Sequence, residues 1–194
     1  MPSVLSATPS RVVLVGHSLG SINAVYEQAT YADADAVITT GMGHVFHTLP
    51  IPGEVIFEMS QQEYFPFPDS LRAQLFYHAP GADPAVIDYD REHLSDLLSR
   101  GQLTTGVFAA FDPAANRVGS VTGPVLAQFG EHDALFPASL SEDEAAFYAS
   151  ASSVTVQTVP GVGHDFNTHF NNHAGWRLMD EWLRARGLHR PAAE

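Results

Sequence analysis

The sequence predicts an α/β fold, in which a mostly parallel β-sheet is flanked by helices and carries a helical insertion. Near both ends of the chain, short apolar runs typical of buried strands alternate with stretches of helical spacing. Each of these runs ends in a turn that contains glycine. Between them, at about residues 43–119, repeated prolines interrupt the alternation, which indicates an insertion into one domain spanning 1–194.

The first predicted strand leads directly into a glycine-flanked serine. The strand consists of Val12, Val13, Leu14 and Val15, and the segment that follows is Gly16-His17-Ser18-Leu19-Gly20. A serine on a sharp turn between a strand and a helix is held in a strained conformation that exposes its hydroxyl. The two glycines are expected to relieve crowding in that turn. Residues 21–30 have the apolar spacing of a short helix, so the stretch predicts a nucleophile elbow at Ser18.

The next run, residues 36–40, is predicted to be the second strand of a βαβ unit, which implies parallel pairing. Within the insertion, residues 70–77 and 88–100 are predicted to be helices, and the second ends at Gly101. The insertion contains ten of the twenty aromatic residues. These rings either line a substrate pocket as a lid or form the insertion's own small core.

Regular alternation returns near the C-terminus. Residues 124–129 and 154–159 are predicted to be the third and fourth strands. Between them, Ser141 and Glu144 have the spacing of a capping box that opens a helix. The last predicted helix, near 168–186, places the side chains of Trp176, Met179 and Leu183 on one face.

Three residues with complementary chemistry follow predicted strands. Ser18, Asp133 and His164 each lie at the carboxyl end of a strand, and those ends share one edge of a parallel sheet. A serine hydroxyl becomes a good nucleophile when an imidazole takes its proton, and a carboxylate holds that imidazole in the required tautomer. The backbone N–H of Leu19 is the expected donor to the developing oxyanion. Glu131 and Asp112 are alternative acids, whereas Asp165 is expected to be a local cap or turn former.

These motifs together resemble the α/β-hydrolase family. The resemblance covers the elbow at Ser18, the segment Gly130-Glu131-His132-Asp133 and the segment Gly161-Val162-Gly163-His164-Asp165. It implies that Ser18 is the nucleophile, Asp133 the orienting acid and His164 the general base, with residues 43–119 as a cap. It also implies a serine hydrolase that acts on an apolar carboxylic ester or related acyl substrate through an acyl-enzyme, without metal or cofactor. An acyltransferase or a cofactor-free peroxidase could use the same triad.

The chain departs from the family in one respect. In the family the elbow follows the fifth strand, whereas here only ten residues precede Arg11, so the sequence resembles a member that lacks its N-terminal strands and the second oxyanion donor. A non-catalytic fragment or binding module is therefore a second interpretation. The first strand, Val12 to Val15, is expected to lie at an open sheet edge and to promote self-association.

Composition excludes several other classes of function. The chain has 22 acidic and 9 basic residues, a formal net charge of −13 and no cysteine, and every basic residue is arginine. Such a charge disfavours nucleic-acid binding, and the composition excludes lysine Schiff bases and thiol chemistry. No membrane span or signal peptide is recognisable, so a cytoplasmic location is expected. His169 and His173 lack the glutamate of a zinc-binding helix, so we expect them at the surface or a helix end.

Overall fold

The main sheet of the computed structural model, which describes residues 10–189, has four parallel strands in the order β1-β2-β5-β6. Their bounds are Val13–His17 for β1, Ala36–Thr40 for β2, Pro124–Gly130 for β5 and Ser153–Val159 for β6. All four therefore end at the same edge of the sheet. The predicted α/β class with a mostly parallel sheet is confirmed, and each predicted strand lies within two residues of an observed one.

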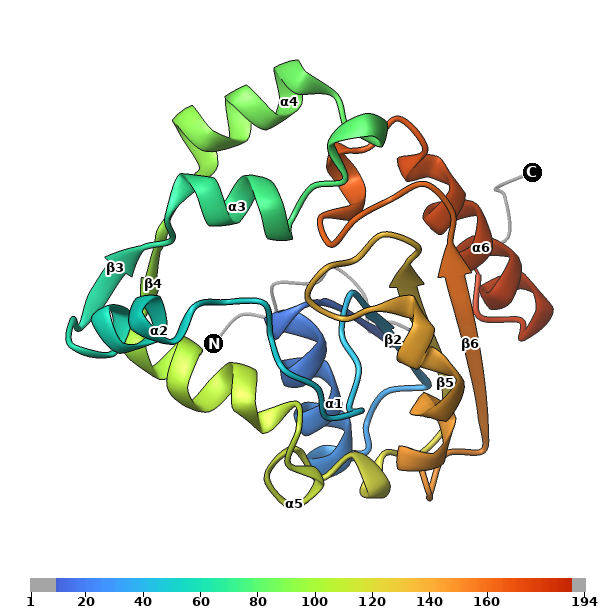
Figure 1. Cartoon of the computed structure of the whole chain (residues 1–194). Coiled ribbons are helices and arrows are strands. Elements are labelled where there is room, and N and C mark those ends of the chain that lie inside the picture. The colour runs from blue at the N-terminus through green and yellow to red at the C-terminus, as the bar shows by residue number, and fades with distance from the viewer. Residues whose placement is uncertain (1–9, 190–194) are drawn as a thin grey trace, which may run out of the picture.

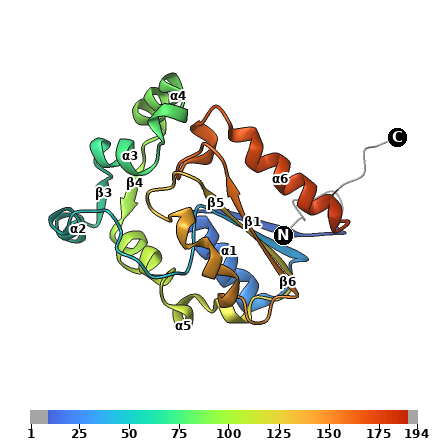
Figure 2. The same ribbon diagram turned by 45° about the vertical axis from the view of Figure 1, so that its right-hand side comes forward.

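Helices cover both faces of this sheet (Figures 1 and 2). Helix α1, Leu19–Tyr31, and the 3₁₀ segment η5, Ala138–Phe147, lie on one face, and α6, Asn172–Ala185, lies on the other. The larger apolar core lies on the α1 side and continues into the insertion. Under α6, Trp182 packs against Ile38 and Leu126 in a smaller core. No helix within residues 10–189 is long and apolar enough to cross a bilayer.

Most of the insertion between β2 and β5, residues 53–107, lies at the left and top of Figure 1, whereas residues 113–120 lie at its lower edge, beside α1. Its α-helices are α2 (Gly53–Ser60), α3 (Asp69–Leu75), α4 (Pro84–Tyr89) and α5 (Pro113–Asn116). Its other helical turns are η1 (Ala79–Gly81), η2 (Asp90–Leu94), η3 (Gln102–Val107) and η4 (Val118–Ser120). Strands β3, Tyr64–Pro66, and β4, Leu97–Ser99, form a separate antiparallel pair.

The predicted helix over residues 88–100 is wrong in its second half. The chain leaves helical geometry after η2 and then forms β4, where Leu98 lies opposite Phe65 of β3. Leu97 is exposed while Leu98 is partly buried, which is the alternation of a strand. A run of only three residues is too short for periodicity to distinguish this strand from a helix.

Two further details of the prediction are wrong. Ser141 and Glu144 do not form a capping box, because residues 138–147 are 3₁₀ helix and the buried Glu144 carboxylate accepts hydrogen bonds from His44 instead. On α6, Trp176 is 48% exposed, and the tryptophan that packs on the sheet is Trp182. The apolar face of α6 therefore runs through Met179, Trp182 and Leu183.

Strand β1 lies at the edge of the sheet, and among the described residues it pairs with β2 alone. Val15 is 60% exposed and Val12, just before the strand, is 37% exposed, whereas Val13 and Leu14 are partly buried. Apolar side chains are therefore accessible beside unpaired backbone groups.

Candidate active site

Ser18 occupies the turn between β1 and α1 in a left-handed backbone conformation, with φ of 52° and ψ of −121°. Its N–H donates to the carbonyl oxygen of Thr40 at 2.9 Å, which anchors the turn to β2. A Cβ atom at Gly16 would lie 2.4 Å from the Gly20 carbonyl oxygen, so glycine is required there. A Cβ atom at Gly20 would meet no described atom outside its own helix within 4 Å. The expected relief of crowding therefore applies to Gly16 and not to Gly20.

The three residues predicted to converge lie in one hydrogen-bonded chain. The Ser18 Oγ is 2.9 Å from His164 Nε2, and His164 Nδ1 is 2.9 Å from Asp133 Oδ2. The Asp133 side chain is fully buried, and its Oδ1 accepts the N–H groups of Leu135 at 2.8 Å and Phe136 at 2.9 Å. These bonds leave Oδ2 for the imidazole. His164 Nδ1 therefore donates to Asp133, and the Ser18 hydroxyl donates to His164 Nε2.

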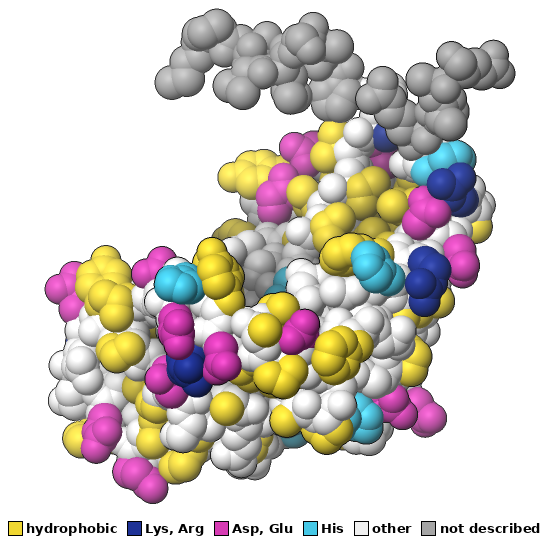
Figure 3. All heavy atoms as spheres, turned by 90° about the horizontal axis from the view of Figure 1, so that it is seen from above, with side chains coloured by type: hydrophobic (Ala, Val, Ile, Leu, Met, Phe, Trp, Pro, Cys, Tyr) yellow, Lys and Arg dark blue, Asp and Glu magenta, His cyan; other side chains and the backbone are white. Residues whose placement is uncertain are grey.

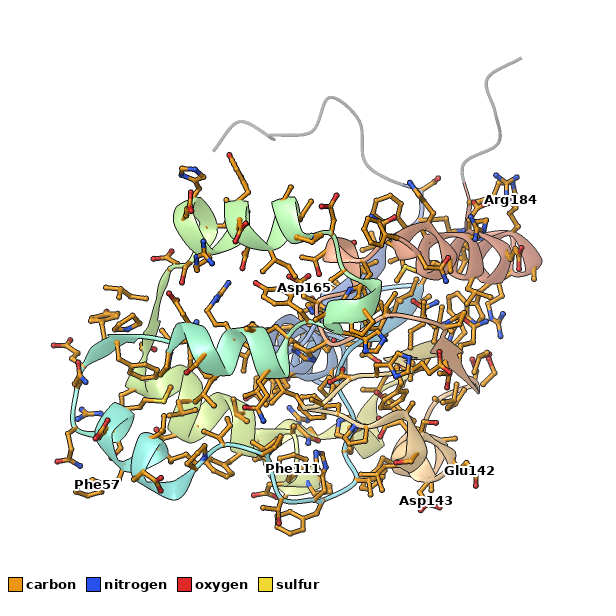
Figure 4. All side chains as sticks on the ribbon, turned by 45° about the horizontal axis from the view of Figure 1, so that its top comes forward. Phe57, Phe111, Glu142, Asp143, Asp165 and Arg184 are labelled. Atoms are coloured by element: carbon orange, nitrogen blue, oxygen red, sulfur yellow. The ribbon has the colours of Figure 1, made fainter. Side chains whose placement is uncertain are left out.

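The other acids considered from the sequence lie elsewhere. Glu131 accepts the N–H of Gly161 at 2.8 Å, and Asp112 caps α5 by accepting the N–H groups of Ala114 and Ala115. Asp165 directly precedes the 3₁₀ turn Phe166–Thr168. Its carboxylate forms no capping hydrogen bond there, but its carbonyl oxygen accepts the Thr168 N–H at 3.3 Å, so it forms the turn through its backbone. In Figure 4 it lies between the cap helices and the body of the molecule.

The sequence analysis missed the role of His169. It lies at the end of the 3₁₀ turn Phe166–Thr168, in accord with the expected helix end, but its side chain is buried and not at the surface. Its Nδ1 donates to the Asp165 carbonyl oxygen at 2.8 Å, and its Nε2 accepts the N–H groups of His78 at 2.9 Å and Gly163 at 3.0 Å. All of its hydrogen-bonding capacity is thus used to hold the loop that carries His164. Within residues 10–189, no group of three or more His, Asp or Glu side chains has the arrangement of a metal site.

Backbone hydrogen bonds join the cap to the same loop. Asp165 N–H donates to Phe76 at 2.8 Å, Asp83 N–H to Thr168 at 3.0 Å and Phe170 N–H to Gly81 at 2.9 Å. A Cβ atom at Gly163 would lie 2.7 Å from the backbone nitrogen of His78, so this close approach requires glycine. The segment 76–83 and the loop 163–170 therefore form one hydrogen-bonded unit.

His17 packs beside His164, with ring centroids 5.1 Å apart. Its Nδ1 is 2.9 Å from Thr40 Oγ1, and that hydroxyl donates its own hydrogen to the Gly16 carbonyl at 3.1 Å, so Nδ1 is the donor. Burial and then the neighbouring His164 lower the pKa of His17 to about 4, while Asp133 acts in the opposite direction. The His17 ring is therefore neutral at pH 7, although part of it remains accessible from the cavity.

A cavity of about 370 Å³ opens onto Ser18 and His164. Its walls are mainly apolar and come from α1, the insertion and the loop after β5, with Leu19, Ile22, Phe67, Phe76, Leu135 and Phe136 among them. Leu19 is the first residue of α1, so its N–H has no acceptor within the helix. A free backbone donor therefore lies directly after Ser18 on the cavity wall.

The aromatic residues of the insertion divide between the two roles considered for them. Phe65 is buried in the core of the insertion, whereas Phe76 lines the cavity and packs 5.6 Å from His164. Phe67 does both. Others face solvent, such as Phe57, which is 65% exposed and lies at the outer end of the cap in Figure 4. On the face seen in Figure 3, such apolar side chains lie among acidic ones that outnumber the arginines.

Comparison with known proteins identifies the family. The model of the alpha/beta hydrolase family matches residues 3–176. The chain belongs to this family. No curated protein sequence matches this alpha/beta hydrolase significantly.

Several solved structures share the fold. The monoacylglycerol lipase of Paleococcus ferrophilus superposes with a TM-score of 0.67 at 18% identity, over 89% of this chain and 68% of that one. A soluble variant of the Saccharomyces cerevisiae monoglyceride lipase, solved with a substrate analogue, superposes with a TM-score of 0.69 at 14% identity, over 90% of this chain and 62% of that one. An esterase from Thermogutta terrifontis superposes with a TM-score of 0.55 at 18% identity, over 90% of this chain and 65% of that one. The alpha/beta hydrolase chain thus spans about two thirds of the length of these lipases and esterases.

Proposed function

We propose that this alpha/beta hydrolase is a serine hydrolase that cleaves a carboxylic ester or a related acyl compound through an acyl-enzyme. One observation carries the proposal, namely the unbroken hydrogen-bonded chain from the Ser18 hydroxyl through His164 to Asp133 at the wall of an apolar cavity. The strained backbone at Ser18 supports it, because such strain is concentrated at functional sites.

The proposed reaction has two halves. His164 Nε2 takes the proton from Ser18 Oγ as that oxygen attacks the substrate carbonyl carbon, and then gives it to the departing alcohol as the C–O bond breaks. In the second half, His164 takes a proton from the water that attacks the acyl-enzyme carbonyl carbon, and returns it to Ser18 Oγ as the bond between that oxygen and the acyl carbon breaks, which releases the acid and the free serine. Asp133 stabilises the imidazolium that forms in each half, since its second oxygen is fixed by two backbone N–H groups.

The N–H of Leu19 is suited to stabilise the oxyanion of each tetrahedral intermediate. It has no acceptor within α1, and it lies at the positive end of that helix. Removal of one oxyanion donor from a serine hydrolase typically slows it by about 10² to 10³-fold, so this group contributes substantially to the proposed rate.

The cavity suits a small apolar acyl group. Side chains from α1 and from the proposed cap, residues 43–119, exclude water from its walls, and a cavity of this size fits a small molecule rather than a polymer. The net charge of −13 makes a strongly anionic substrate less favourable.

Mass spectrometry after exposure to a fluorophosphonate tests the proposal without a known substrate. We expect one covalent adduct on Ser18, and we expect it to be absent in Ser18→Ala and strongly reduced in His164→Ala. The exposed Ser150→Ala serves as the matched control and keeps the adduct. A folded protein that acquires no adduct would contradict the proposal and favour a non-catalytic binding module. Product analysis with added alcohol or peroxide then separates hydrolysis from acyl transfer and peroxidation.

A further inference from the structure

The lining of the cavity includes a few polar side chains. Apart from His17, Ser18 and His164, its polar lining side chains are those of Arg72, Gln102 and Asp165. Arg72 and Asp165 belong to the same corner, because Asp165 donates its N–H to Phe76, one turn beyond Arg72.

The corner lies next to the imidazole of His164. The Arg72 guanidinium carbon is 5.4 Å from the centroid of the Phe76 ring, and that ring lies 5.6 Å from the His164 ring. Asp165 follows His164 directly in the chain. A group bound between Arg72 and Asp165 would therefore lie on the histidine side of Ser18.

Arg72 is fixed in place and retains a free donor. Its guanidinium forms an ion pair with Asp90, whose carboxylate also accepts the Tyr77 hydroxyl, and only 14% of the Arg72 side chain is exposed. The Arg72 Nε has no hydrogen-bond partner within the described part of the chain, but it is sealed from solvent. The ion pair and the contact with Tyr77 use Nη2, so Nη1 is the donor left for a ligand. Because the ion pair immobilises the side chain, little conformational entropy is lost when a ligand binds there.

The Asp165 carboxylate is also available. It forms no hydrogen bond to another side chain within residues 10–189, although most of it is shielded from water. Burial and the nearby Asp90 raise the pKa of its carboxyl group, while His164, a hydrogen bond from the Asn167 backbone and Arg72 lower it. A carboxylate that accepts one backbone N–H still has lone pairs for a second donor. The corner thus combines a cationic donor with a carboxyl acceptor.

We infer that this corner, formed by Arg72 and Asp165, binds the alcohol portion of the substrate, and that this alcohol carries a second, uncharged hydroxyl group. The inference rests on the proposed function, because His164 must lie beside the leaving oxygen to protonate it. A hydroxyl can accept from Arg72 and donate to Asp165 at the same time. A carboxylate would meet the negative charges of Asp165 and Asp90, and an ammonium group would meet the positive charge of Arg72. An alkyl group would form no hydrogen bond to the Asp165 carboxylate or to the remaining donor of Arg72.

Three esters of butanoic acid test the inference. The 2-hydroxyethyl and propyl esters have alcohols of nearly equal size that differ in one hydroxyl, and the carboxymethyl ester adds a negative charge. We expect kcat/KM, divided by the rate constant for hydrolysis by hydroxide, to be about tenfold or more higher for the 2-hydroxyethyl ester than for the propyl ester. The carboxymethyl ester is expected to be the slowest.

Two variants assign this preference to the corner. Asp165→Leu and Arg72→Met should each reduce the ratio between the 2-hydroxyethyl and propyl esters to near one. Arg91→Met, which removes an exposed arginine of the cap, is the matched control and keeps the ratio. Arg72→Met leaves Asp90 without its cation, so Asp165→Leu provides the test if thermal unfolding shows that the arginine variant is misfolded.

The outcomes separate the inference from the function on which it rests. An enzyme that is labelled at Ser18 but cleaves both uncharged esters equally, or prefers the carboxymethyl ester, overturns the inference and leaves the hydrolase proposal intact. An unchanged preference in Asp165→Leu also overturns it. A folded protein that acquires no label and cleaves no ester overturns both.

Discussion

His44 Nδ1 lies 2.6 Å from Glu144 Oε1, although the two residues are 100 positions apart and neither side chain is exposed. Glu144 Oε2 also accepts the backbone N–H of His44 at 2.8 Å. This pair joins the segment after β2 to the 3₁₀ segment after β5, and so it fixes the chain on either side of the insertion.

Loss of this pair is expected to destabilise the fold strongly. Glu144→Ala leaves a buried imidazole and a backbone N–H without their acceptor, which typically costs about 3 to 5 kcal/mol. Urea denaturation measures the free energy of unfolding. Glu142→Ala, on the same segment but exposed (Figure 4), should change it by less than about 0.5 kcal/mol. Equal effects at the two positions would contradict the importance of the buried pair.

Asp133 is expected to control the reactivity of Ser18. In Asp133→Asn the amide can satisfy either His164 Nδ1 or the N–H groups of Leu135 and Phe136, but it cannot act as a carboxylate toward the imidazolium. We expect fluorophosphonate labelling to slow by about 10⁴-fold, as in other serine hydrolases. Glu131→Gln, the nearest alternative acid, should label at nearly the original rate. If Glu131→Gln were labelled slowly and Asp133→Asn at nearly the original rate, Glu131 and not Asp133 would be the acid that orients His164.

His169 is expected to act as a positioning residue for the loop that carries His164. His169→Phe keeps a ring of similar size but leaves the N–H groups of His78 and Gly163 unpaired, at about 1 to 3 kcal/mol for each buried group. In His169→Phe the labelling of Ser18 should slow more than the loss of stability explains. His169→Gln should be labelled faster than His169→Phe, because its amide oxygen can accept one of these N–H groups. A variant with a lower melting temperature and an unchanged labelling rate would indicate a purely structural role.

The lowered pKa of His17 makes a prediction about acid stability. The unfolded chain takes up a proton at His17 near pH 6.5, whereas the folded protein takes it up only near pH 4, so protonation favours unfolding. The free energy of unfolding should therefore be maximal above pH 6.5 and fall as the pH decreases toward 4. His17→Gln should lose less stability over this interval in urea titrations at several pH values. The same loss in both proteins would argue against a desolvated His17.

The open edge at β1 leads us to expect self-association. Val15 is 60% exposed beside backbone groups that no described strand pairs, so a second copy could extend the sheet. Sedimentation velocity should show concentration-dependent association that Val15→Lys reduces. Trp176→Lys, which removes an exposed apolar side chain from α6, should leave it unchanged. A protein that is monomeric at every concentration would refute this expectation.

The sequence predicts the sheet well because its strands are runs of β-branched apolar residues with glycine after them, as in residues 36–40. The meeting of Ser18, Asp133 and His164 also follows from sequence, since each lies in the segment after a strand of one parallel sheet. The partnership of His44 with Glu144 does not, because no local spacing records a contact across 100 residues. For the same reason, the sequence around Glu144 suggests a capping residue, and the sequence around His169 does not reveal that its side chain is buried.

The backbone bonds between residues 76–83 and the loop 163–170 constrain how the cavity admits a substrate. If the cap swung away at that corner, it would pull on the loop that holds His164 and disturb the proposed base at the moment of entry. The opposite rim has no such tie, since β3 and β4 pair only with each other within residues 10–189. We therefore expect a substrate to enter without movement of the segment 76–83, from the side of the cavity near β3 and β4.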